Sequence, residues 1–319
     1  MKLARVSVAQ SSPFSYASLA SLVTLASVIS LAGCSASDDG SHFLDSTNGG
    51  DASSSRGTDA ASGGIDSGAG LDASFATDGS QDASAPVGEV YAQSADTLYK
   101  LEPFSKVTTV IGKFTGCAGQ VIDIALDKSG QMFATTFNSL EKVDKSNAKC
   151  TTIAHGSYPN SLTFVPIGTL DPSSEALVGF EGDQYVRIDT TSGAKTTVGA
   201  LNPNATGKTY ISSGDVVSII GDKTYLTVKV TPALAGDGII EVDPKTGKAL
   251  KLIGDTGITD VFGLAYWAGT AYAFTNGGEI AAINLTTGQS TLIPIPNPPP
   301  GLSFWGAGVT TAAPTVPPK

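Results

Sequence analysis

Three aspartates lie where side chains from different parts of the chain could meet and do chemistry. Asp123, Asp215 and Asp260 lie in or just before the apolar runs VIDIAL, VVSII and VFGLAYW, and Asn160 holds the comparable place before a fourth run. Oxygen atoms gathered in this way suit a hard cation such as Ca²⁺. Two carboxyl groups of unequal pKa would instead suit glycoside hydrolysis. A third interpretation is that these groups are solvated or cap backbone N–H groups. They are weak candidates, because their distances to the following repeat differ.

Other kinds of catalytic chemistry find little support in the residue inventory. A nucleophilic serine or cysteine needs a histidine beside it, and the only histidines are His42 and His155. His155 follows the fourth strand of a repeat, where a surface position is expected. There is no CxxC or HxxxH spacing for zinc, and the glycines fall at turns. The segment DPKTG from Asp243 lacks the acidic pattern of an EF-hand and predicts a turn. We expect no cofactor beyond the Ca²⁺ considered above.

The body of the chain holds two cysteines, Cys117 and Cys150. An exported compartment favours a disulfide between them. The expected topology argues against it, because Cys117 lies in a loop leading into an innermost strand whereas Cys150 begins an outer strand, near the opposite face. A disulfide needs Cα atoms within about 7 Å of each other. The sequence leaves this pairing open.

Residues 1–33 have the pattern of a secretion signal. Lys2 and Arg5 precede an apolar run over about residues 14–31, which ends in Leu31-Ala32-Gly33-Cys34. This ending resembles the lipobox of bacterial lipoproteins. The resemblance implies that Cys34 is acylated and becomes the mature N-terminus. The alternatives are an ordinary signal peptide with a chance cysteine, or a retained membrane anchor.

The same resemblance implies a location in the cell envelope. Two or three acyl chains hold a protein stably on a membrane. In lipoproteins of this kind, Ser35 after the cysteine suggests the outer membrane, and the acidic segment 37–39 loosely resembles a surface-export signal. We therefore expect a lipid-anchored protein of the outer membrane or cell surface.

The segment 34–86 joins this cysteine to the body. Its 52 residues after Cys34 are nearly all Ser, Gly, Ala and Asp, with nine aspartates against one arginine. So few large apolar side chains cannot offset the entropy of ordering, which predicts a disordered tether. A flexible coil of this length spans about 40 Å. The chain as a whole carries a net charge of -10 and shows no basic patch, which argues against nucleic acid as a partner.

One short pattern is repeated five times after the tether. Each copy is an apolar strand, a turn and a Thr-rich strand, as in YVRIDTTSGAKTTVG from Tyr185. The apolar anchors of the copies lie 42, 45, 54 and 41 residues apart, and such a period predicts the blades of a propeller. The anchors are Leu101, Val143, Ile188, Val242 and Ile283.

Two more apolar runs precede each of the last four copies, which completes four blades. The first copy is preceded only by EVYA from Glu89, and the unmatched run FWGAGVTT lies at 304–311. Pairing these two segments would close a ring and remove its free edges. The sequence thus predicts an all-β, five-bladed β-propeller over 87–312, followed by a Pro-rich tail over 313–319.

The blade motifs resemble those of secreted bacterial β-propellers with NHL-like or quinoprotein-like blades. VDPKTGKALKLIG and IDTTSGAKTTVG carry the likeness. That group includes binding scaffolds, sensors and some enzymes, so the resemblance implies a fold and no activity. We expect a non-catalytic scaffold for a glycan, a peptide or another envelope protein. The alternative is a carbohydrate-active hydrolase that uses Asp123, Asp215 and Asp260.

Overall fold

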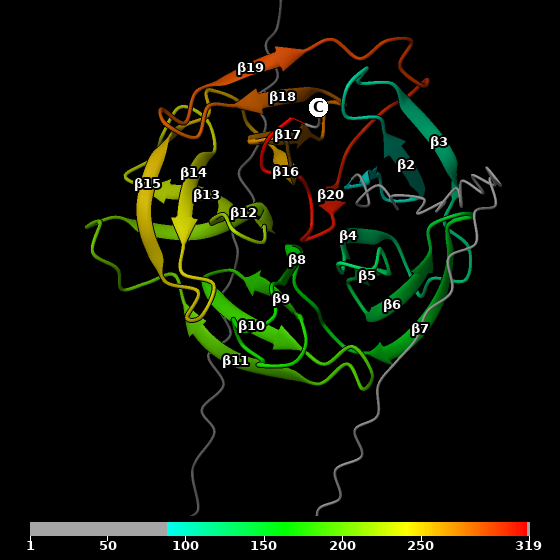
Figure 1. Cartoon of the computed structure of the whole chain (residues 1–319), viewed down its shortest axis with the longest axis horizontal. Coiled ribbons are helices and arrows are strands. Elements are labelled where there is room, and N and C mark those ends of the chain that lie inside the picture. The colour runs from blue at the N-terminus through cyan, green and yellow to red at the C-terminus, as the bar shows by residue number, and fades with distance from the viewer. Residues whose placement is uncertain (1–87, 318–319) are drawn as a thin grey trace, which may run out of the picture. The chain divides into compact units, whose positions relative to one another are not determined.

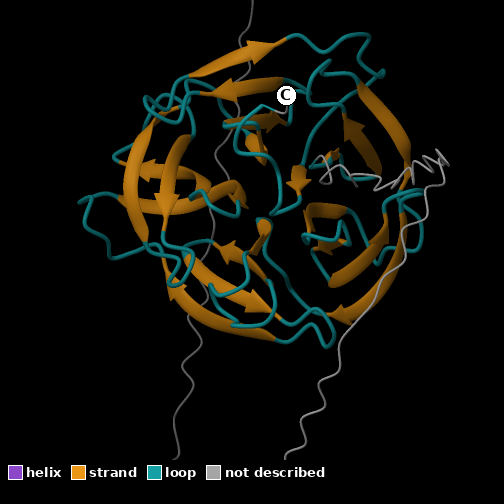
Figure 2. Ribbon diagram, in the orientation of Figure 1, coloured by secondary structure: helices purple, strands orange, loops and turns teal. Residues whose placement is uncertain are grey.

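The computed structural model of the chain describes residues 88–317; the signal segment, Cys34 and the segment up to residue 87 lie outside the described residues. The described part contains twenty β-strands, which form five four-stranded antiparallel sheets. Figures 1 and 2 show these sheets as blades around one central axis. The predicted five-bladed β-propeller is therefore confirmed. Within the described residues, no helix has the length and apolar character that crossing a membrane requires.

Each blade consists of four strands, which follow one another from the axis outward. Blade 1 is β20 (Gly306–Val309), β1 (Val90–Gln93), β2 (Thr97–Leu101) and β3 (Thr108–Lys113). Blade 2 is β4 (Val121–Leu126), β5 (Met132–Thr136), β6 (Ser139–Asp144) and β7 (Lys149–His155). Blade 3 is β8 (Leu162–Val165), β9 (Ala176–Glu181), β10 (Gln184–Ile188) and β11 (Lys195–Ala200). Blade 4 is β12 (Thr209–Ser218), β13 (Thr224–Thr231), β14 (Gly238–Val242) and β15 (Ala249–Asp255). Blade 5 is β16 (Val261–Trp267), β17 (Thr270–Thr275), β18 (Ile280–Ile283) and β19 (Ser290–Ile293).

The hydrophobic core lies between neighbouring blades. One cluster joins Phe133 and Leu140 of blade 2 to Phe164 and Leu177 of blade 3, and similar clusters fill the other junctions. Inner strands are covered by a blade on each side, so all six residues of β4 are buried. Outer strands such as β3 are half exposed. This difference explains why the inner strands lack the alternation of apolar and polar residues.

The turn of each repeat is closed by its Asp or Asn. Asp144, Asp189, Asp243 and Asn284 each accept a hydrogen bond from the backbone N–H two residues later, at 2.8–3.0 Å. In the last three turns the glycine four residues on has a φ of 70–83°, which glycine adopts without strain. The DPKTG segment is thus a turn, as its sequence predicts.

Ring closure joins the two ends of the described chain. β20 pairs with β1 in antiparallel register, with Val309 opposite Val90 and Gly306 opposite Gln93. The predicted completion of blade 1 by the C-terminal strand is confirmed. Beyond it, Ala313 is buried and the Pro314 carbonyl accepts a hydrogen bond from the Ala268 N–H, so this part of the tail packs on the propeller.

The two faces of the ring differ in what they carry. We call the face where the innermost strands begin the mouth, and the opposite face the base. Because Val90 lies opposite Val309, at the far end of β20, the chain enters the propeller at the base. Glu89 confirms this position, since it pairs with Lys145 in the turn between β6 and β7. Both ends of the described chain therefore lie at the base.

Candidate functional site

A pocket of about 500 Å³ lies at the mouth, where all five blades contribute to its lining. Each blade supplies one residue from the start of its innermost strand. Two of these side chains are aromatic and one is an amide, so the pocket combines apolar walls with a group that can both donate and accept hydrogen bonds. The five residues are Ile122, Asn160, Gly214, Phe262 and Trp305.

Bulges in the innermost strands underlie this convergence. The ladder shifts register between Val121 and Asp123 in β4, and between Val261 and Gly263 in β16. Ile122 and Phe262 are the residues left out of the ladder. A bulge re-aims the side chain of its extra residue, which here lines the pocket. β12 has a longer irregularity of the same kind, between Ser212 and Val216, and Gly214 lies within it.

Loops of blades 2 and 3 form the rest of the pocket wall. Phe137, in the turn between β5 and β6, is 61% exposed. Tyr158 and Pro159 are buried, and the Tyr158 hydroxyl donates to the Gly193 carbonyl at 2.8 Å, which fixes the ring. Glu181 pairs with Lys195, so its charge at the pocket edge is balanced.

The residue that follows each of these five in the chain forms a second layer. This layer contains two carboxyl groups, one hydroxyl and two glycines. Gly306 makes room for an acid, because a Cβ there would lie 2.3 Å from Asp123 Oδ1, whereas a Cβ on Gly263 would meet the backbone of Gly306 and Ala307 at 2.7–2.8 Å. The five residues are Asp123, Ser161, Asp215, Gly263 and Gly306.

The two acids of this layer bind the backbone of adjoining blades. The Asp123 carboxyl accepts hydrogen bonds from the N–H groups of Ile124, at 2.8 Å, and of Leu162 in blade 3, at 2.6 Å. The Asp215 carboxyl accepts from Val216 at 2.6 Å and from Leu264 in blade 5 at 2.9 Å. Every carboxyl oxygen of the pair therefore accepts a backbone N–H.

The same two carboxyl groups lie close enough for their charges to interact. Both are fully buried, and burial raises the pKa of each well above its usual range; for Asp123, the neighbouring charge of Asp215 raises the pKa further. Two carboxylates in contact cannot both stay ionised at low cost, so the pair holds a proton. This arrangement binds blades together and leaves no carboxyl oxygen free to face a substrate.

Asp260 does not join the other two predicted residues. It is exposed, with a φ of 57°, and lies three residues before the position that matches Asp123 and Asp215. The residue of β16 that matches Asp123 is Gly263, because each follows the bulged residue of its strand. Among the described residues, no three or more His, Cys, Asp or Glu side chains lie together as a metal would require. Asn160 lies one residue before Ser161, the layer residue of blade 3, and belongs to the pocket lining.

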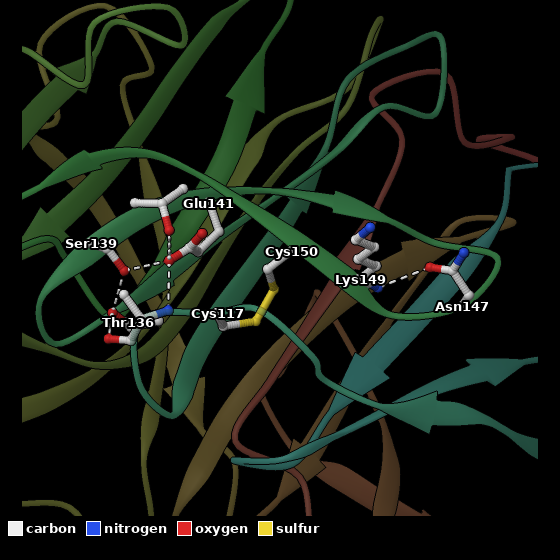
Figure 3. Close-up of a disulfide and its surroundings, with 9 residues drawn as sticks. Cys117, Thr136, Ser139, Glu141, Asn147, Lys149 and Cys150 are labelled. Atoms are coloured by element: carbon white, nitrogen blue, oxygen red, sulfur yellow. Dashed lines mark hydrogen bonds between the residues drawn. A yellow bond between two sulfur atoms is a disulfide. The ribbon is translucent and has the colours of Figure 1, made fainter.

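A disulfide joins Cys117, in the loop between β3 and β4, to Cys150 in β7, with the Cα atoms 4.9 Å apart. Figure 3 shows this bond beside Glu141, whose Oε1 accepts a hydrogen bond from the Ala118 N–H at 3.0 Å. The expectation that the two cysteines lie near opposite faces was wrong. Each blade twists until its outer strand runs along the rim of the ring, so the end of β3 reaches the start of β7. The Cys150 N–H donates to the Thr115 carbonyl at this contact.

Sequence reasoning missed the aromatic lining of the mouth. A usable signal exists once the innermost strands are aligned on their bulges: Phe262-Gly263 and Trp305-Gly306 then fall in one column with Ile122-Asp123. His155 is exposed at the end of β7, and His42 lies outside the described residues.

Comparison with known proteins adds little to this picture. No protein-family model and no curated protein matches the chain. Among solved structures, a protein of unknown function from Bacteroides caccae is 10% identical, over 68% of this chain and 77% of its own, with a TM-score of 0.35. The Dos1 propeller is 11% identical, over 66% and 56%, with a TM-score of 0.35. Sqt1 from Saccharomyces cerevisiae is 13% identical, over 69% and 62%, with a TM-score of 0.30. The chain thus spans less than two thirds of the length of the Dos1 propeller and of Sqt1.

Proposed function

We propose that this protein is a lipid-anchored protein of the cell envelope, at the outer membrane or cell surface, whose propeller binds a ligand at its mouth without catalysing a reaction. The observation that carries the proposal is the mouth pocket, to which every blade contributes at least one residue. A concave, mostly apolar pocket with a few polar groups is the usual form of a ligand site. Bulges in β4, β12 and β16 support this role, since bulges are frequent beside functional sites.

Binding without turnover fits the chemistry of the mouth better than hydrolysis does. A glycosidase needs two carboxyl groups that reach the substrate from opposite sides. Asp123 and Asp215 are fully buried and all four of their oxygens accept backbone N–H groups. Glu181 is the one acid in the pocket lining, and a single acid cannot supply the pair that hydrolysis requires.

The position of the chain ends supports display of the mouth. The chain enters the propeller at the base, on the side opposite the pocket. The segment that leads to Cys34 would therefore join the propeller at the base, which leaves the mouth open to a ligand. The segment 34–86 would supply the distance from the membrane.

A pocket-filling variant tests the proposal. Asn160→Trp places a large side chain in the pocket from an exposed position, so the fold should tolerate it. We expect a thermal-shift screen of neutral saccharides, acidic saccharides and short peptides to find a class that raises the Tm of the natural protein and leaves this variant unchanged. The same mixtures should show no product formation. Equal stabilisation of both proteins, or turnover that Asp215→Asn abolishes without unfolding, would overturn the proposal.

A further inference from the structure

We infer that the ligand of the mouth pocket is a neutral saccharide. This inference rests on the proposed function and names the chemical class that the pocket lining fits. Three properties of the lining carry it: its aromatic surfaces, its unused hydrogen-bonding groups and its lack of uncompensated charge.

The aromatic surfaces are separate from one another. Phe137, Phe262 and Trp305 come from blades 2, 5 and 1, and none of them packs against another aromatic ring of the described chain. Phe262 and Trp305 are partly exposed, and Phe137 is largely exposed. Flat apolar surfaces left open to solvent from several sides of one pocket suit a ligand with apolar faces of its own. The C–H faces of a pyranose ring provide such surfaces.

Three polar groups of the lining are unused within the described part of the chain. The Asn160 amide, the Ser157 hydroxyl and the Trp305 indole N–H make no hydrogen bond there, and none of these atoms is buried. Together they offer donors and acceptors in the same pocket lining as the aromatic rings. A polyhydroxylated ring matches this mixture, because each hydroxyl both donates and accepts.

The charge balance favours a neutral ligand over an acidic one. Glu181 is the only ionisable acid of the lining and forms an ion pair with Lys195. The carboxyl pair below the pocket is buried and occupied by backbone N–H groups. The lining residues themselves include no lysine or arginine that could neutralise a uronic acid or sulfate. An acidic polysaccharide would therefore find no cation in the lining to pair with its own charges.

Tryptophan fluorescence locates the binding event. The chain has two tryptophans, and Trp267 is buried in blade 5, at the end of β16 away from the mouth. In the full chain carrying Trp267→Phe, the fluorescence of Trp305 alone reports on the pocket. We expect neutral gluco-, manno-, xylo- or chito-oligosaccharides to change this fluorescence in a saturable way. Oligogalacturonate and a casein peptide digest should leave it unchanged.

Titration calorimetry on variants completes the test. Trp305→Ala and Asn160→Ala should each weaken binding of the active oligosaccharide by at least about tenfold, because each removes a central contact of a small site. Phe104→Ala is the control, since Phe104 is an exposed aromatic residue in the turn between β2 and β3, at the base and away from the pocket. It should leave the affinity unchanged. Asn160→Ala keeps the test valid if Trp305→Ala does not fold.

The outcomes separate this inference from the proposed function. A peptide or oligogalacturonate that alone changes Trp305 fluorescence would overturn the saccharide assignment and leave the mouth as the binding site. Oligosaccharide binding that persists at full affinity in Trp305→Ala and Asn160→Ala would overturn the assignment as well. A Trp305 signal from none of the three classes would count against both the saccharide and the proposed function.

Discussion

At the scale of single residues, the carboxyl pair on the axis defines how the blades are held at their centre. Asp123 links blade 2 to Leu162 of blade 3, and Asp215 links blade 4 to Leu264 of blade 5. The Ala307 N–H of blade 1 also faces Asp215. The two acids thus contact every blade, and hydrogen bonds to charged or partly charged acceptors are stronger than neutral ones.

The pair should make stability fall as pH rises. Both carboxyl groups have a folded-state pKa above the unfolded value of about 3.9, so the folded protein keeps a proton that the unfolded chain loses. The contribution of the pair to the free energy of unfolding is complete below about pH 4. Above that pH it declines by up to about 1.4 kcal/mol per pH unit for one proton. We expect the difference in free energy of unfolding between the natural protein and Asp123→Asn to shrink as pH rises from 4 to 8. Urea unfolding across that range measures it.

Asp183→Asn is the control for this experiment. Asp183 lies in the surface turn between β9 and β10, and its substitution should leave the pH dependence of the natural protein intact. A difference between natural protein and Asp123→Asn that grows with pH would mean that the pair is ionised in the folded state.

At the scale of elements, glycines near the ends of outer strands let neighbouring blades meet at the rim. A Cβ on Gly199 of β11 would lie 2.1 Å from the carbonyl oxygen of Thr246, in the outer turn of blade 4. Gly254 of β15 stands in the same relation to Thr287 of blade 5. The terminal glycines of the third and fourth copies of the repeat therefore serve packing between blades, whereas a Cβ on Gly112 of the first copy would meet Asn147 only at 3.7 Å.

Gly199→Ala should lower stability by about 1–3 kcal/mol, because the new methyl group meets backbone that cannot move aside. Gly277→Ala is the matched control, since a Cβ there meets only side-chain atoms at 3.5 Å or more. Thermal unfolding compares the two. Equal melting temperatures would show that the rim contact is looser than the structure describes.

The disulfide should stabilise the loop between blades 1 and 2. It closes a sequence separation of 33 residues, for which the entropy lost by the unfolded chain corresponds to about 3–4 kcal/mol. We expect Cys117→Ser with Cys150→Ser to lower the free energy of unfolding by about that amount. Thiol titration of the denatured, non-reduced Cys34→Ala protein should find no free thiol; two free thiols would contradict the pairing.

The elements differ in how far the sequence predicted them. Val121–Leu126 and Val261–Trp267 were visible as apolar runs, because strands between blades are apolar on both faces. The alignment of Asp123 with Gly263 was not visible, since a bulge at Ile122 or Phe262 moves the following residues without leaving a linear pattern. Blade twist likewise brought Cys117 to Cys150 against the expectation from strand order. Periodicity predicts strands, whereas bulges and twist decide which side chains meet.

At the scale of the whole molecule, the C-terminal strand closes the ring. β20 lies between β1 of its own blade and the innermost strands of blades 5 and 2. Deleting residues 302–319 should expose the edge of β1 and cause aggregation or loss of cooperative unfolding. Deleting only residues 316–319 is the control and should leave the unfolding curve unchanged. An unchanged curve for the longer deletion would refute closure by this strand.

Attachment to a membrane depends on Cys34, which lies outside the described residues. We expect Cys34→Ala to abolish acylation and to leave the protein unprocessed or released from the membrane fraction, since the proposed anchor needs its thiol. Mass spectrometry of the mature N-terminus makes the comparison. An unmodified mature N-terminus beyond Cys34 in the natural protein would contradict the anchor.

The central claim is that this propeller binds its ligand at the mouth. Hydrogen exchange of the full chain, with and without whichever saccharide or peptide raises its Tm, tests that claim most directly. We predict that added protection is confined to the residues that line the pocket, namely 122, 137, 157–160, 181–182, 214, 262 and 305, and to their immediate neighbours. Protection confined to the base or to the outer strands, with the mouth unchanged, would contradict the account.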